Sequence, residues 1–111
     1  MAQWLGQFNG HTHATKVEDV EETLRHAVAA FRAADAGDRG RKAKSVRNIA
    51  ERLLSARLKL LKARLAALEP VAEGREQNAD GIEALRARQA QLRAEGVSGV
   101  LTEFGAQGAL G

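Results

Sequence analysis

The longest uninterrupted helical pattern of the chain covers residues 41–68, and it constrains the fold more than any other feature. The stretch lacks Gly and Pro and is rich in Ala, Leu, Arg and Lys, which favour helices. At about 100° per residue, its large apolar side chains fall on two adjacent faces roughly 90° apart. The first face holds Val46, Ile49, Leu53 and Leu60, and the second holds Leu54, Leu58, Leu61, Leu65 and Leu68. A seam with one neighbouring helix is narrower, so we expect this segment to lie centrally between two neighbours.

The residues before this segment predict an antiparallel partner for its first face. Apolar residues recur every three or four positions from Val17 to Phe31, and Thr15 with Glu18 forms a capping-box pattern. We therefore predict a helix over 16–36, and a connector at 37–40 with Gly at both ends. In a hairpin of this kind the numbers of facing residues add up to about 77. The facing pairs are then all apolar: Val17–Leu60, Leu24–Leu53, Val28–Ile49 and Phe31–Val46.

The same register places Glu21 opposite Arg57, which projects into the apolar side of 41–68. A buried Arg needs a partner, so we predict a structural ion pair between Glu21 and Arg57 that fixes the alignment of the hairpin. The alternative is that this Arg binds an anionic ligand.

A third helix is predicted over 81–95. Asp80 to Glu83 resembles a capping box, Ile82, Leu85 and Leu92 form an apolar stripe, and Gly96 can end the helix. The predicted fold is therefore all-α, an antiparallel helical hairpin extended to a three-helix bundle over 16–95.

Two less regular segments flank this helical domain. The N-terminal arm, residues 1–15, carries apolar residues at one-turn spacing that we expect to cover the Leu61–Leu68 end, in this chain or in a partner. Residues 96–111 contain five of the eleven Gly and read as a flexible tail with one adhesive segment, 100–104. The predicted partner-binding residues are Trp4, Leu5, Phe8, Val100, Leu101 and Phe104.

The arm also contains His11 and His13, whose side chains share a face in an extended backbone and are candidate ligands for Zn²⁺, Ni²⁺ or Cu²⁺. A structural zinc site needs four ligands, and the chain has no Cys. We therefore expect His11 and His13 to be polar residues of the arm that bind no metal ion, and we expect the protein to use no cofactor. Gly-rich phosphate loops, nucleophile elbows and His-Glu-x-x-His motifs are absent, so we expect no enzymatic activity.

Charge is unevenly distributed, although the net charge is only +3. Residues 38–68 contain ten Lys and Arg against Asp38 and Glu51. Cations on the outer side of 41–68 are candidate phosphate contacts for nucleic acid, although no aromatic residues lie between them for base stacking. They are Arg41, Lys44, Arg52, Lys59 and Lys62.

The function predicted from these features is a non-enzymatic, coiled-coil-like scaffold or adaptor that self-associates and docks on a protein partner of unknown identity. The alternative is a nucleic-acid-associated protein that uses the basic outer face. The chain has no apolar run of 18 residues, so we expect no membrane insertion, and we expect a cytoplasmic location.

Overall fold

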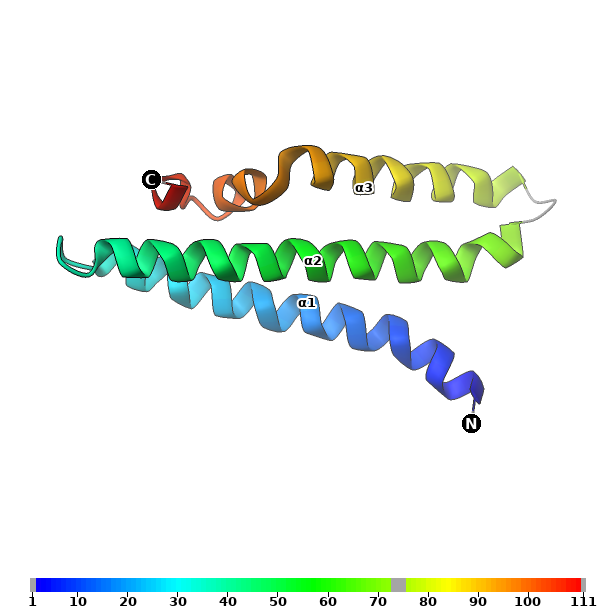
Figure 1. Ribbon diagram of the computed structural model, residues 1–111. Helices are drawn as coiled ribbons and strands as arrows, with labels where there is room; N and C mark the ends of the chain where they lie inside the picture. Colours follow the sequence, from blue (N-terminus) through cyan, green and yellow to red (C-terminus); the bar gives the residue numbers. More distant parts are fainter. Residues whose placement is uncertain (1, 73–75, 111) are drawn as a thin grey trace.

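Helix α2 (Arg39–Ala72) lies at the centre of the molecule, with α1 (Ala2–Ala33) and α3 (Glu76–Glu103) packed on different sides of it (Figure 1). A short 3₁₀ helix, η1 (Gln107–Leu110), follows α3. This computed structural model describes the backbone of residues 2–72 and 76–110, and the side chains of 12–68 and 81–110. The described residues contain helices and turns but no strand, which confirms the all-α, three-helix prediction and the central position of the middle helix.

The hairpin of α1 and α2 builds the main core. Leu24, Val46 and Leu53 are fully buried, and the other predicted stripe residues of α1 join them. Each such side chain stabilises the fold by about 1.5–3 kcal/mol. In the turn between the helices, the backbone N–H of Asp38 donates to the carboxylate of Asp35 at 3.0 Å. An Asp in this position satisfies an N–H that the next helix leaves unpaired.

The N-terminal arm was predicted to precede the first helix, but α1 begins at Ala2. Thr15 lies inside the helix and does not cap it, because a capping box is a local preference that adjoining helical turns override. The side chains of Trp4, Leu5, Phe8 and His11 lie outside the described residues. The packing of Trp4, Leu5 and Phe8 over the Leu61–Leu68 end therefore stays a prediction.

Helix α1 ends at Ala33, three residues before the predicted end, whereas α2 and α3 extend beyond their predicted boundaries. Helix α2 continues past Pro70 to Ala72, because a proline in the last turn removes one backbone hydrogen bond and leaves the earlier turns intact. Helix α3 begins at Glu76 and passes through Gly81, although a Gly inside a helix costs about 1 kcal/mol. The packing of α3 on α2 offsets that cost.

The segment predicted to be a flexible tail, residues 96–111, is instead part of the core over the residues described. Helix α3 breaks at Gly96, where φ is 59° and ψ is −151°, and helical backbone resumes before Glu103. Val100, Leu101, Ala106 and Ala109 are all buried in the main core. Gly96 was correctly predicted as a helix break, but the chain then turns onto the hairpin. We call residues 97–110 the C-terminal segment.

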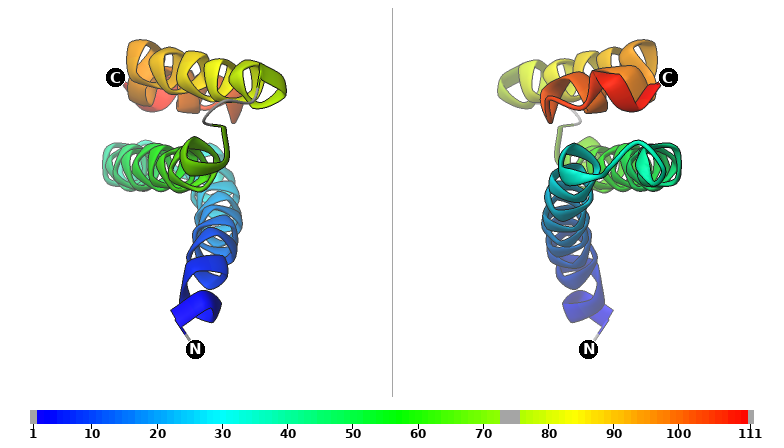
Figure 2. Two further views of the ribbon diagram at one scale, coloured as in Figure 1. Left: turned by 90° about the vertical axis from the view of Figure 1, so that its right-hand side faces the viewer. Right: turned by 90° about the vertical axis from the view of Figure 1, so that its left-hand side faces the viewer.

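Helix α1 diverges from α2 and α3 towards its N-terminal end (Figure 2). The radius of gyration is 17.1 Å, whereas a compact domain of this length has a radius of about 13 Å. The accessible surface is 7429 Å², against roughly 6,000 Å² for a compact monomer of this mass. This divergence leaves one side of α2 open between its two neighbours. Among the described residues, no helix is long and apolar enough to span a membrane.

Candidate interaction site: an arginine cluster and the groove beside it

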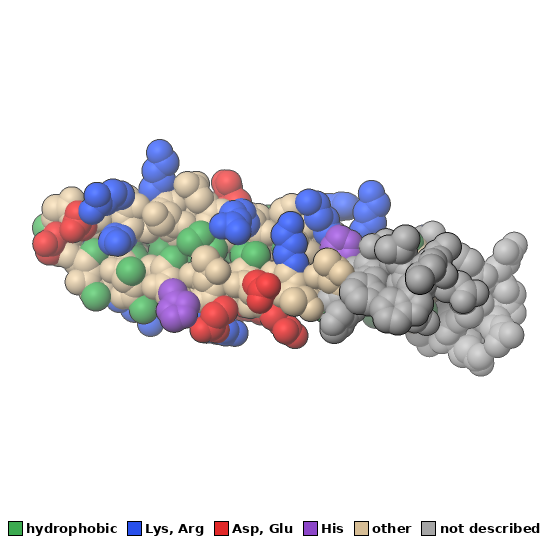
Figure 3. All heavy atoms as spheres, turned by 90° about the horizontal axis from the view of Figure 1, so that it is seen from below, with side chains coloured by type: hydrophobic (Ala, Val, Ile, Leu, Met, Phe, Trp, Pro, Cys, Tyr) green, Lys and Arg blue, Asp and Glu red, His purple; other side chains and the backbone are tan. Residues whose placement is uncertain are grey.

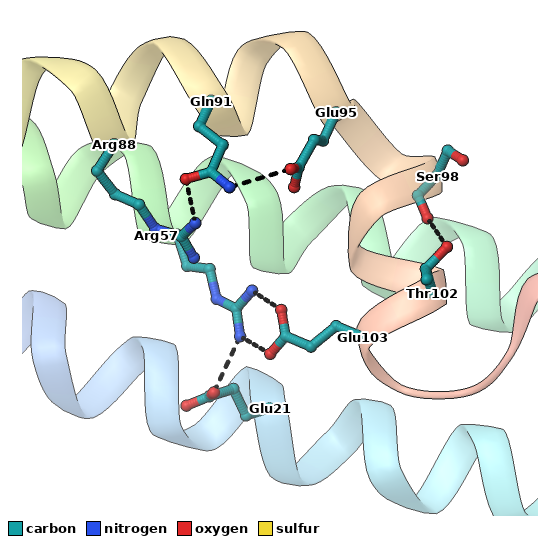
Figure 4. Close-up of polar contacts among 8 residues, drawn as sticks. All are labelled: Glu21, Arg57, Arg88, Gln91, Glu95, Ser98, Thr102 and Glu103. Atoms are coloured by element: carbon teal, nitrogen blue, oxygen red, sulfur yellow. Dashed lines mark hydrogen bonds and ion pairs between the residues drawn. The ribbon is translucent and has the colours of Figure 1, made fainter.

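The side chain of Arg57 joins three parts of the fold (Figure 4). Its Nη1 and Nη2 atoms donate to the two carboxylate oxygens of Glu103 at 2.7 and 2.8 Å, and Nη2 also donates to Glu21 at 3.1 Å. The predicted Glu21–Arg57 pair is thus present, which supports the register of the hairpin. Arg57 is only 13% exposed, and its two carboxylate partners supply the charge that a desolvated guanidinium requires.

The electrostatics of this cluster follow from these bonds. The hydrogen bond from Arg57 lowers the pKa of Glu103, against the opposing effect of partial burial. The same hydrogen bond raises the pKa of Arg57. Both groups are therefore charged around neutral pH, and the cluster serves as a fixed ion pair instead of a proton donor or acceptor.

Two further arginines hold the C-terminal segment against the hairpin. Nη2 of Arg32, on α1, donates to the carbonyl of Gly105 at 2.8 Å, and Nη1 of Arg47, on α2, donates to the carbonyl of Ala109 at 2.6 Å. In both contacts the guanidinium donates to a backbone carbonyl at the C-terminal end of a helical segment, where carbonyls lack a partner within the helix. Sequence reasoning missed them and Glu103, because no periodic pattern links these residues to the C-terminal segment.

Beyond Arg57, towards the C-terminal end of α2, the C-terminal segment no longer covers the space between α1 and α3. An open groove of about 350 Å³ lies there, and α1, α2 and α3 all contribute to it. Its walls are mainly aliphatic, three arginines interrupt them, and none of the described residues that line it is an Asp or a Glu. The lining residues are Val17, Arg57, Leu60, Leu61, Arg64, Leu85, Arg88 and Leu92. We call this the arginine groove.

A second groove, of about 310 Å³, lies between α2 and α3 on another side of α2. It has only two leucines, Leu54 and Leu58, and its charged lining is mixed: Glu51, Lys59, Lys62 and Arg93. Its fewer aliphatic lining residues and mixed charges make it a weaker candidate for binding a protein than the arginine groove.

The predicted partner-binding residues of the C-terminal segment do not form an exposed patch. Val100 is 2% exposed and Leu101 is fully buried, so a partner would reach them only by displacing the segment. Phe104 is half-buried against the core. Among the described residues, Leu110 is the only exposed large apolar side chain. Val100 and Leu101 complete the chain's own core in this conformation, and their docking role stays a prediction.

The predicted basic face is exposed along α2. Its members are Arg41, Lys44, Arg52, Lys59 and Lys62. Of these, only Arg41 forms an ion pair with a described residue, Asp38. Figure 3 shows Lys and Arg recurring along the upper side of one face, while most Asp and Glu lie at its lower side and left end.

The histidines form no cluster in the part of the chain whose side chains are described. His13 is half-buried, and His11 lies outside the described side chains. Nε2 of His26 lies 3.2 Å from the carboxylate of Glu22, and both are exposed. No group of three or more His, Asp or Glu side chains among these residues is arranged to hold a metal ion.

Comparison of the chain with protein-family models, with curated proteins and with solved structures finds no match. The function is therefore inferred from the geometry and charge of this chain alone.

Proposed function

We propose that this protein is a non-enzymatic helical adaptor that self-associates and docks on a protein partner. The observation that supports it best is the arginine groove, an open groove to which all three helices contribute and whose partly exposed aliphatic side chains include Leu60 of α2 and Leu85 of α3. Grooves between helices commonly receive a helix of another protein. The surface of the chain, larger than that of a compact monomer, is consistent with additional burial in an assembly.

The surroundings of the grooves favour binding over catalysis. Neither groove brings a His next to a Ser or another nucleophile, an arrangement that nucleophilic catalysis uses. Arg57 and Glu103, the charged pair with shifted pKa values, bond to one another and stay ionised. Among the described residues, no buried side-chain nitrogen or oxygen lacks a hydrogen-bond partner.

Photo-crosslinking in cells of the native host tests the docking proposal. A photoreactive amino acid replaces Leu85 in the arginine groove or, as a control, Arg52 on the outer side of α2. We expect a discrete crosslinked protein from position 85 and none from position 52. Equal crosslinking from both positions, or none from position 85, would contradict a groove-based adaptor.

Light scattering tests the self-association proposal separately. The expected mass at micromolar concentration is that of a dimer or a larger assembly of the 11.9 kDa chain. A monomeric mass across the accessible concentration range would remove self-association from the proposal and leave partner docking standing.

Nucleic-acid binding is the second candidate function, and the exposed cations of α2 favour it. Lys44, Arg52 and Lys59 form no ion pair with other described residues, so they are available to phosphates. Each phosphate contact contributes a slope of about −0.9 to the dependence of log affinity on log salt. We expect duplex retention at about 50 mM salt that falls steeply by 200 mM if this function holds. Absence of retention at the lower salt excludes it.

A further inference from the structure

The C-terminal segment fills part of the space beside α2 between α1 and α3, which we call the trough. It therefore shows what kind of helix fits there. Its helical part places Val100 and Leu101 in the core, while Glu103 pairs with Arg57 from α2 (Figure 4). The site that the C-terminal segment occupies therefore combines an aliphatic floor with an arginine that donates hydrogen bonds to a carboxylate of the bound helix. The arginine groove lies next to this site along α2, and Arg57 lines the groove where the two meet.

Arg64 repeats the position of Arg57 one heptad further along α2, and it lines the groove. Continuing the Glu21–Arg57 register along α1 brings Ala14 opposite Arg64, so α1 offers no carboxylate there. Among the described residues, no carboxylate pairs with Arg64, and its side chain is exposed. Arg88, on α3, adds a second cation and donates its hydrogen bond to the neutral Gln91 at 2.9 Å. Arg88 also lies near enough to Glu103 to help lower the pKa of that carboxyl, so Arg64 is the arginine of the groove that has no acidic partner among the described residues.

We propose that the arginine groove binds an acidic amphipathic helix of a partner protein. Its apolar edge packs on the half-buried Leu60 and Leu85, and a carboxylate on the same side pairs with Arg64, as Glu103 pairs with Arg57. This inference rests on the proposed adaptor function and names the class of partner. An Arg–carboxylate pair at the edge of an apolar contact gives specificity and orientation more than raw affinity.

The sequence of the chain argues for a different protein as the occupant instead of a second copy. Residues 2–15 include the apolar Trp4, Leu5 and Phe8 but contain no Asp or Glu, so they offer Arg64 no carboxylate. The C-terminal segment has the required acid, but Val100 and Leu101 are already buried in the site that it occupies. The acidic residues of α1 belong to a helix whose apolar stripe is buried against α2.

A displayed library of helices tests this inference directly. The probe is a set of amphipathic helices about four turns long, with Leu fixed along one edge and with Glu, Lys, Gln or Ala varied at the flanking positions. We expect the full-length protein to enrich Glu over Lys at one flanking position. Lack of enrichment, or enrichment of Lys, would overturn the proposal.

Charge reversal at Arg64 tests whether this residue pairs with the carboxylate of the bound helix. Against purified peptides with Glu or Lys at the enriched position, Arg64→Glu should lower the Glu-to-Lys preference about tenfold or invert it. Arg52→Glu is the matched control, since it reverses an exposed Arg of the same helix outside the groove, and it should leave the preference unchanged. An unchanged preference in Arg64→Glu, or equal effects in both variants, would also overturn the proposal. Circular dichroism checks that both variants stay folded.

The photo-crosslinking at position 85 separates failure of this inference from failure of the adaptor function. One outcome is that the Arg64→Glu variant still captures the crosslinked partner and that the library shows no preference for acidic helices. This outcome would retain the adaptor function but reject the acidic helix as its ligand. No crosslinked protein at position 85 rejects the adaptor itself. A crosslink between two copies of this chain at position 85 identifies the occupant as a second copy and overturns the inference.

Discussion

Arg57 and Glu103 lie 46 positions apart in the sequence, yet they form a two-fold hydrogen-bonded pair at 2.7 and 2.8 Å. Glu21 contacts the same guanidinium from α1. One side chain therefore connects α1, α2 and the C-terminal segment at the point where the covered part of the trough ends and the arginine groove begins. Changes to this pair should alter how firmly the C-terminal segment is held.

Replacing Glu103 by Gln is expected to loosen the C-terminal segment. The substitution removes the charge-assisted bonds to Arg57 but keeps the size of the side chain, and Glu103 is 48% exposed. A hydrogen bond to a charged group contributes about 1.5–3 kcal/mol, and solvent screening reduces this to about 1 kcal/mol. Hydrogen exchange of residues 97–106, followed by mass spectrometry, should become faster. Glu95→Gln is the control, since Glu95 accepts only from Gln91; equal exchange in the two variants would argue against the pair.

The same pair predicts a dependence of stability on acid pH. The folded protein lowers the pKa of Glu103 from its ordinary value of 4.5, so the pair stabilises the fold fully above that value. This contribution is lost as the pH falls through the lower, folded pKa. The free energy of unfolding in urea should therefore decrease from about pH 5 to pH 3 more steeply in the wild type than in Glu103→Gln. Parallel pH profiles for the two proteins would contradict the assignment.

The hairpin was predictable from the sequence, because periodic apolar residues carry the information. The stripe from Val17 to Phe31 and the first face of α2 both line the core, and the register gave the Glu21–Arg57 pair. The second face was also correctly predicted to need a neighbour, since Leu61, Leu65 and Leu92 are buried apart from the main core.

The C-terminal segment was not predictable in the same way. Its high Gly content suggested flexibility, but Gly96 and Gly105 have positive φ values and direct the chain back onto the hairpin. A reversal of this kind is set by two backbone angles and by distant contacts such as Arg32 to Gly105, which leave no periodic trace. The arginine groove was missed for a related reason: it forms only because α1 diverges from α2 and α3.

Gly96→Ala tests the role of the backbone reversal. The φ of 59° and ψ of −151° belong to a region that residues with a Cβ avoid, at a cost of about 1–3 kcal/mol. We expect the variant to be less stable in urea by that amount. Gly81→Ala should have the opposite sign, with a gain of up to about 1 kcal/mol, because Gly81 lies in a helix and an added Cβ meets nothing within 4 Å. Equal effects of the two substitutions would contradict the described kink.

The burial of Leu101 gives the most direct test that the C-terminal segment belongs to the core. Leu101 is fully buried, whereas Leu110, in the same segment, is 50% exposed. Truncating a buried Leu to Ala costs about 2–5 kcal/mol, because apolar contacts are lost and a cavity remains. Leu101→Ala should therefore lower the free energy of unfolding in urea by this amount, and Leu110→Ala should change it by less than about 0.5 kcal/mol. If both variants unfolded like the wild type, the segment would not be packed on the hairpin, and the trough would be open along its whole length.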